Sequence, residues 1–242
     1  MTKLKLRPAS TIETIFEAIL AEIVRGKYPP GARLPAEREL SRAMGASRPT
    51  LREALRRLAE WKLIEAKRGS GVVVRDRNEW SIEVLPAYIR YARPGPGEAS
   101  IAQLLHDLLT IRRTVIREMI LMVAGRIPSG ATSAAREQVA RAWAARADLR
   151  QFTIEDFGVM RAVVEAGHFL PAVWLLNRLS AIYLDIAQSL TGTMAPPENY
   201  TESHGRFLDA LENSDGARAA TLMDGYLDAH DREILKVLEV FL

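Results

Sequence analysis

The strongest constraint on the fold of this chain is a series of short helical patterns near its N-terminus. Apolar residues recur at helical spacing over residues 12–23, and Gly26 supplies a C-cap. A second helical pattern covers 36–44 and ends at Gly45, and a third covers 47–58. Two helices joined by a short turn that contains glycine are typical of a helix-turn-helix. The sequence therefore predicts that motif early in the chain.

The third of these helices begins with residue types that suit contact with DNA. Ser47 can cap it, Pro49 fits its first turn, and Arg48, Thr50 and Arg52 follow. Arginine offers two parallel donors to a guanine edge, hydroxyl groups serve bases or phosphates, and a helix N-terminus attracts phosphate. This composition favours insertion of the helix into the major groove.

A β-hairpin is expected directly after the third helix. Apolar positions in 63–67 and 72–74 flank the turn Arg68-Gly69-Ser70-Gly71, which is the pattern of strand, tight turn and strand. Its tip places Lys67 and Arg68 beside flexible glycines, where they can follow the sugar-phosphate backbone or enter a minor groove. The hairpin is therefore interpreted as the wing of a winged helix-turn-helix.

The charge of the chain is divided between a basic first part and an acidic remainder. Residues 1–75 carry 16 Lys and Arg against 8 Asp and Glu, a net charge of +8, and residues 76–242 carry 17 against 22, a net charge of −5. Only the first part is expected to meet a polyanion such as DNA. The chain has no cysteine, which excludes disulfides and thiolate metal sites, and no stretch approaches 18 apolar residues. We expect a cytoplasmic protein without a membrane partner.

Beyond Arg75 the sequence predicts helices only. A short amphipathic helix is expected over 80–92. We divide the chain into a winged helix-turn-helix of residues 1–75, a linker with the short helix over 76–100, and an all-helical domain of 101–242. The domain is expected to be an antiparallel bundle with helices near 101–126, 131–148, 153–168, 171–191, 199–213 and 215–240. The fold class is therefore mostly α, with a small β-hairpin.

Residues 29–74 read PPGARLPAERELSRAMGASRPTLREALRRLAEWKLIEAKRGSGVVV and closely resemble the DNA-binding domain of the GntR family of bacterial regulators. The resemblance extends over 11–75. Its three most specific runs, at 34–40, at 47–55 and at the Gly-Ser-Gly of the wing (69–71), occur in the expected order. Pro49 departs from the threonine often found there, which removes one hydroxyl contact. The resemblance implies that DNA is contacted by Arg38, Ser47, Arg48, Thr50 and Arg52, and by the wing residues Lys67, Arg68 and Gly69.

An all-helical domain behind such a head is similar to the FadR subfamily, whose effector domain is a helical bundle with a central cavity. The run at 108–113 and the run at 161–167 resemble two helices of that domain. The resemblance implies that a small-molecule effector changes the spacing of two heads. A single small reader buries little DNA surface, so we expect a homodimer on a palindromic double-stranded operator.

Many members of the subfamily hold a divalent metal through one Asp and three His. Asp156 and His204 match two of these positions, but Met160 and Tyr226 stand at the other two. His230 lies one turn beyond Tyr226 and could substitute. We expect no cofactor and no metal; if a metal is bound, its ligands are Asp156, His204 and His230. The alternative for Asp156 and His204 is a buried hydrogen-bonded pair or a helix-capping role.

The fatty-acid-responsive branch of the subfamily binds acyl-coenzyme A without metal, and the pattern around Met160 and Tyr183 resembles it. We expect an acyl-CoA, a fatty acid or another apolar anion as the effector. Arg112, within an apolar helix face, is the expected charge partner, and its alternative is a salt bridge to Asp156. The candidate effector residues are Arg112, Asp156, Met160, Tyr183, His204 and Tyr226. A tunnel lined by Met119, Met122, Met160, Val163, Trp174 and Tyr183 is the hypothesis for the acyl chain, with ordinary core packing as its alternative.

Two other classes of protein remain as alternatives. One is an architectural DNA-binding dimer that has no effector. The other is a metal-dependent enzyme in the bundle, but the nucleophile-elbow, P-loop and zinc-protease motifs do not occur in this sequence. Within the head, Arg56 and Arg57 are expected to be solvated or salt-bridged, and the alternative role of Arg38 is an ion pair on its own helix.

Overall fold

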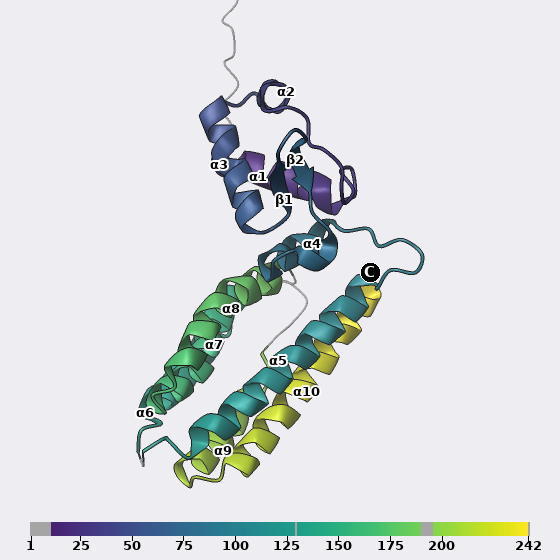
Figure 1. Cartoon of the computed structure of the whole chain (residues 1–242). Coiled ribbons are helices and arrows are strands. Elements are labelled where there is room, and N and C mark those ends of the chain that lie inside the picture. The colour runs from purple at the N-terminus through teal and green to yellow at the C-terminus, as the bar shows by residue number, and fades with distance from the viewer. Residues whose placement is uncertain (1–10, 129, 190–195, 242) are drawn as a thin grey trace, which may run out of the picture. The chain divides into compact units, whose positions relative to one another are not determined.

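The computed structural model describes residues 11–128, 130–189 and 196–241, and the chain divides into two compact units (Figure 1). The first unit ends at Arg93 and the second begins at Pro94. No helix in the described part of the chain is long and apolar enough to cross a membrane.

The first unit contains three main helices and a two-stranded sheet, as the sequence predicts for a winged helix-turn-helix. Its elements are α1 (Ile12–Val24), α2 (Glu37–Ala43), α3 (Arg48–Glu60), β1 (Ile64–Lys67) and β2 (Gly71–Val74). β1 and β2 pair antiparallel, with Ile64 opposite Val74 and Lys67 opposite Gly71. The predicted fold class is therefore confirmed for this unit.

The core of this unit lies between the apolar faces of α1 and α3. Both faces follow the helical period: Phe16 and Ile19 of α1 and Leu51 and Leu58 of α3 have no exposed surface. Burying side chains of this size contributes about 1.5–3 kcal/mol each to folding. The ring of Phe16 also meets Trp61, just after α3, edge to face with 4.8 Å between ring centroids. This packing fixes the direction of α3.

The segment after the wing packs on the head, whereas the sequence assigned residues 76–100 to a linker. It forms η1 (Arg77–Glu79), η2 (Ile82–Val84) and α4 (Leu85–Tyr91), so its α-helix is shorter than expected. The amide of Ser81 donates to the carbonyl of Trp61 at 3.0 Å, and Tyr91 donates to Glu17 of α1 at 3.4 Å. Because Val84 and Ala87 are buried, the segment belongs to the first unit up to Arg93.

The second unit consists of long helices, and every helix expected from the sequence is present. They are α5 (Ile101–Ala124), α6 (Ser133–Ala144), α7 (Leu149–Ala166), α8 (Leu170–Ser189), α9 (Tyr200–Glu212) and α10 (Gly216–Phe241). The largest errors, of four residues each, are at the end of α6, predicted at residue 148, and at the start of α7, predicted at residue 153. The side chain of Asp148 accepts a hydrogen bond from the Gln151 amide and caps the helix four residues earlier. The predicted end of α8 at residue 191 lies outside the described residues.

The two longest helices, α5 and α10, run antiparallel along each other. In Figure 1 the end of α10 lies beside the start of α5. Contacts agree with this direction, because Arg113 pairs with Asp228 while Ala124, farther along α5, meets Gly216 at the start of α10. α7 packs against both α6 and α8, and α9 packs against α6 and α10. The antiparallel bundle predicted from the sequence is confirmed.

Candidate nucleic-acid interface and candidate effector site

The start of α3 presents hydroxyl groups and an unpaired arginine. Ser47 accepts a hydrogen bond from the Thr50 amide at 3.2 Å, and the two hydroxyl groups are hydrogen-bonded at 2.6 Å. Arg48 is exposed and has no ion-pair partner within the described ranges. The first turn of α3 contains no acidic residue, so nothing there opposes the positive end of the helix dipole. This end of the helix is suited to a phosphate or a base edge.

Arg52 of α3 and Arg38 of α2 differ in their surroundings. Nε of Arg52 donates to Oε2 of Glu37 at 2.8 Å, and both side chains are more than a third exposed. Arg38 is exposed and makes no ion pair with the described residues, on its own helix or elsewhere. A solvent-exposed ion pair contributes about 0–1 kcal/mol to stability. Glu37 therefore orients Arg52, but little free energy is lost if Arg52 leaves Glu37 to contact DNA.

Arg56 and Arg57 are engaged within the head, as expected for salt-bridged residues. Arg56 pairs with Glu53 and Glu60 on the same helix, at 2.9 and 2.8 Å. Arg57 pairs with Glu13 of α1 at 2.5 Å, and its guanidinium lies 4.2 Å from the centroid of the Phe16 ring. These two arginines stabilise α3 and its packing on α1.

The wing has a free cation at its tip and an additional backbone edge beside it. Arg68 is exposed and unpaired within the described part of the chain, whereas Lys67 pairs with Glu65 at 2.9 Å. Gly69 adopts φ +76°, which only glycine adopts readily in a tight turn. Sequence reasoning missed Arg33, which forms an isolated antiparallel bridge with Val73 and donates from Nη2 to Ser70 Oγ at 3.1 Å. Its position just before Leu-Pro was not informative without the tertiary pairing.

A second group of functional candidates lies inside the helical unit, where polar and aromatic side chains of five helices meet. We call it the buried polar cluster. Its members are Arg112 of α5, Asp156 of α7, Tyr183 of α8, Tyr200 and His204 of α9, and Tyr226, His230 and Asp231 of α10. Five of the six predicted effector residues, all except Met160, lie at three of its contacts: Arg112 with Tyr183, and His204 with Asp156 and with Tyr226.

His204 is the central residue of this cluster. Its Nδ1–H donates to the carbonyl of Tyr200 at 2.8 Å, and its Nε2 lies 3.9 Å from Oδ1 of Asp156. The rings of Tyr200 and Tyr226 approach it, with centroids at 4.2 and 4.8 Å. Burial lowers the pKa of His204, and the nearby Asp156 carboxylate only partly opposes this shift. The expected pairing of Asp156 with His204 is therefore a loose contact between a neutral imidazole and a carboxylate.

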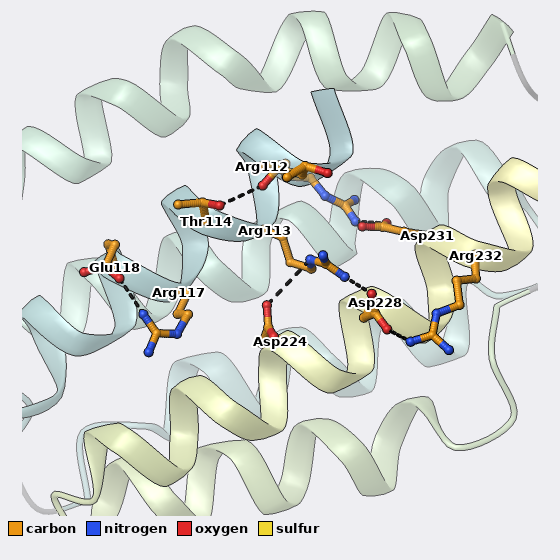
Figure 2. A network of polar contacts seen from close by, with 10 residues as sticks. Arg112, Arg113, Thr114, Arg117, Glu118, Asp224, Asp228, Asp231 and Arg232 are labelled. Carbon is orange, nitrogen blue, oxygen red and sulfur yellow. Dashed lines mark hydrogen bonds and ion pairs between the residues drawn. The ribbon is translucent and has the colours of Figure 1, made fainter. Parts of the chain in front are cut away.

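Arg112 is the only cation among the members of the cluster. Its Nη1 donates to the Tyr183 hydroxyl at 3.1 Å, and its Nη2 donates to Oδ1 of Asp231. The sequence alternative of a salt bridge to Asp156 is wrong, because α10 lies along α5 and brings Asp231 against Arg112 (Figure 2). Asp231 was missed, although Asp224, Asp228 and Asp231 recur at helical spacing on α10 and form an acidic stripe.

The neighbouring Arg113 makes a separate connection between the same two helices. It bonds Asp228 and lies 3.6 Å from Asp224, and Arg232 bonds the other oxygen of Asp228 (Figure 2). These side chains are more exposed than Arg112 and Asp231, which are 15% and 7% exposed. α5 and α10 are thus joined by one buried ion pair and one exposed network.

Several polar atoms of the cluster are buried without a hydrogen bond to any described residue. They are Nε of Arg112, Oδ2 of Asp231 and the hydroxyl of Tyr200. Buried donors and acceptors in native proteins nearly always have a partner. Burial also raises the pKa of Tyr200, Tyr226 and Tyr183, which keeps all three phenols protonated as donors, and it raises that of Asp231 against the opposing charge of Arg112. The cluster therefore has hydrogen-bonding capacity that the described residues do not use.

The residues of this cluster do not match the geometry of a metal site. Within the described ranges no three His, Asp or Glu side chains converge as ligands. The ring of Tyr226 lies between His204 and His230, stacked on His230 with centroids 6.4 Å apart. Met160, which stands where the family has a histidine, is buried in the apolar core. Asp156, His204 and His230 are therefore not arranged to close a tetrahedral site.

The residues expected to line an acyl tunnel lie in two different environments. Met119, Met160 and Val163 are buried in the core of the bundle. Met122 and Trp174 are 53% and 62% exposed, because they occupy the outward faces of α5 and α8. The expectation that these two residues line an internal tunnel is therefore wrong for this chain.

The head and the bundle together define a class of protein. A winged helix-turn-helix with exposed arginines at the start of its third helix and at its wing, followed by an all-helical domain, is the architecture of a DNA-binding transcription regulator. The model of "Bacterial regulatory proteins, gntR family" matches residues 11–74, and that of the FCD domain matches residues 107–229. The chain therefore belongs to the GntR family and carries an FCD domain, and it is a regulator rather than an enzyme.

Named relatives and a solved structure agree with this assignment. Mce2R, an HTH-type transcriptional regulator of Mycobacterium tuberculosis, is 27% identical over 230 residues, which cover 95% of this chain and 93% of its own. The fatty acid metabolism regulator protein of Yersinia pestis is 31% identical over 174 residues, which cover 71% of this chain and 69% of its own. Lar of Listeria monocytogenes shares the fold with a TM-score of 0.57 at 12% identity, over 96% of this chain and 99% of its own.

Proposed function

We propose that this regulator binds its operator through the head and that an anionic small molecule, bound at the buried polar cluster, controls that binding. The observation that carries the second half is Arg112, a buried cation with an unpartnered donor inside the FCD domain. Charged side chains are almost never buried unless their charge is compensated or used. Asp231 compensates the charge of Arg112 but leaves its Nε without an acceptor, and an oxygen of an anionic ligand supplies that missing hydrogen bond.

The proposed DNA contacts follow the exposed cations of the head. Arg38, Arg48 and Arg68 lie on α2, on α3 and at the wing, and none of them has a partner among the described residues. Such cations lose no internal ion pair when they bind phosphate or guanine. The full proposed set is Arg38, Ser47, Arg48, Thr50, Arg52, Lys67, Arg68 and Gly69. Two copies of the head on a palindromic site are proposed because one copy presents a single recognition helix.

A fatty acyl group is the proposed apolar part of the effector. The supporting facts are the relative named fatty acid metabolism regulator protein and the apolar surroundings of the cluster. Phe157 contributes to these surroundings, because its ring lies 5.9 Å from that of Tyr183, centroid to centroid. The candidate effector residues are Arg112, Asp156, Met160, Tyr183, His204 and Tyr226, and we add Tyr200 and Asp231 to this proposal because both contact members of this set.

Two experiments test the two halves of this function. Selection of bound fragments from random duplex DNA is expected to return a palindromic sequence, and a collection without a shared sequence would reduce the head to a non-specific binder. Native mass spectrometry of the purified full chain is expected to show a bound small molecule. Adding that molecule to the complex of protein and operator is expected to release the operator. If the dimer binds the operator with the same affinity after its ligand is removed and after ligand is added back, the protein is an architectural DNA-binding protein and not an effector-controlled regulator.

A further inference from the structure

We propose that Asp231 occupies the position of an effector carboxylate on Arg112, so that the cluster recognises ligands with a free carboxylate, which displace Asp231. This inference rests on the proposed function and specifies the chemical class of its effector. It makes Asp231 an internal competitor of the ligand. It also selects a free acid over a thioester among the fatty acyl compounds.

The pairing of Arg112 with Asp231 uses only half of its hydrogen-bonding capacity. Nη2 of Arg112 bonds Oδ1 of Asp231, while Nε of Arg112 and Oδ2 of Asp231 are both buried and unpartnered among the described residues. Arginine and carboxylate groups favour two parallel hydrogen bonds. Because Asp231 is fixed to α10, it reaches one donor only. A free carboxylate can turn to accept from both Nε and Nη2.

Conservation of charge decides which ligand can replace Asp231. Arg112 and Asp231 are both buried, and removing one partner of a buried ion pair leaves an uncompensated charge, which is strongly unfavourable. A carboxylate that takes the place of Asp231 keeps one negative charge on the guanidinium, and the displaced Asp231, whose pKa burial already raises, takes up a proton. A thioester is neutral and leaves Arg112 unpaired. A phosphate adds a second negative charge to a cluster that already contains Asp156.

The surroundings of Arg112 are suited to the remainder of such a ligand. Nη1 is held by the Tyr183 hydroxyl at 3.1 Å, so the guanidinium keeps its orientation when Asp231 leaves. The buried Tyr200 hydroxyl, which burial and the nearby Asp156 keep protonated, is a further donor. The rings of Phe157 and Tyr183, with centroids 5.9 Å apart, offer an apolar wall to a hydrocarbon chain.

The release of Asp231 changes one of the two connections between α5 and α10. Arg113 keeps its bond to Asp228 and its contact with Asp224 in either state, because these groups lie outside the buried pair (Figure 2). Only the ion pair between Arg112 and Asp231 is replaced by a contact with the ligand. The ligand therefore removes one contact between α5 and α10, and the other contacts keep the two helices together.

Chemical rescue tests the vacant carboxylate position without knowledge of the natural effector. In Asp231→Ala, acetate or formate is expected to raise Tm saturably at constant ionic strength, because the small anion takes the place of the missing side chain. Asp228→Ala is the matched control on the exposed network. Its Tm in acetate is expected to equal its Tm in chloride at the same ionic strength. Rescue must also vanish in the double variant Arg112→Ala/Asp231→Ala. Equal responses to acetate in all three variants would overturn the inference.

Ligand competition gives a second test, which holds even if Asp231→Ala fails to fold. Asp231→Asn keeps the size of the side chain and removes its charge, so its affinity for decanoate is expected to rise at least about tenfold over the native chain. Decanoyl-CoA is expected to gain no such affinity. Unchanged affinity for decanoate, or tighter binding of the thioester than of the acid, would contradict the inference. If acetate rescues Asp231→Ala but no acid releases the operator, the proposed function fails and the carboxylate site stands.

Discussion

At the scale of single residues, the arginines of the head divide into those that the fold uses and those that it leaves unpaired. Arg56 and Arg57 are paired with Glu53, Glu60 and Glu13, whereas Arg48 has no partner within the described ranges. The sequence separated the two groups in the same way, but it could not identify the partner of Arg57. That partner, Glu13, is brought near by the packing of α1 on α3, which is a tertiary property.

The first prediction compares two arginines of the same helix. Arg48→Ala is expected to weaken specific operator binding by about 1–3 kcal/mol, or roughly 5- to 150-fold in Kd, because a charge-assisted contact to DNA is lost. Arg56→Ala is expected to leave operator affinity within about twofold, since Arg56 is paired on the surface of α3. Anisotropy titrations of a labelled operator measure both. Equal losses in the two variants would contradict the assignment of the recognition surface.

The second prediction concerns the tip of the wing. Arg68→Ala is expected to weaken binding to operator and to random duplex by the same factor, because the side chain meets the phosphate backbone. The slope of log K against log salt is expected to become shallower by about one. Titrations at several salt concentrations measure that slope. Loss of affinity for the operator alone would make Arg68 a reader of base sequence.

At the scale of elements, the helices of the bundle were predictable and their contacts were not. The apolar period located α5, α7 and α10, since each buries one stripe of its surface. The start of α7 was missed because Asp148 caps it, and a single capping residue among other polar residues is a weak signal. The partner of Arg112 was missed for a different reason. Asp156 and Asp231 are both acidic residues on helices far from Arg112 in the sequence, so the sequence does not say which of them pairs with it. The packing of α10 on α5 brings Asp231 to Arg112.

The third prediction concerns the approach of the end of α7 to α5. A Cβ atom added at Gly167 would lie 2.0 Å from a methyl carbon of Val123, which is fully buried. Gly167→Ala is therefore expected to lower the free energy of unfolding by about 1–3 kcal/mol, as overpacking does. Thermal or denaturant unfolding measures the change.

A second glycine of the bundle provides the matched control for this substitution. Gly205 lies inside α9, and no atom outside its helix lies within 4 Å of its added Cβ. Gly205→Ala is expected to raise the free energy of unfolding by up to about 1 kcal/mol, the difference in helix propensity. Destabilisation of similar size in both variants would show that helix geometry, not the contact with Val123, governs Gly167.

At the scale of the whole molecule, two units with opposite charge divide the work of the regulator. The head presents unpaired arginines to DNA, and the bundle buries an arginine whose Nε has no partner among the described residues. Sequence patterns were sufficient for the fold, the family and the position of the head's cations. They were insufficient for the effector site, because that site is assembled from side chains of five helices far apart in sequence.

The central claim is that a ligand at Arg112 controls operator binding, and one titration tests it most directly. Labelled operator is titrated with the native chain and with Arg112→Ala, each with and without the ligand that co-purifies with the native protein. The account predicts that ligand changes the operator Kd of the native chain at least about tenfold, while Arg112→Ala keeps the ligand-free Kd and loses the response. An equal response to ligand in both proteins would contradict the account.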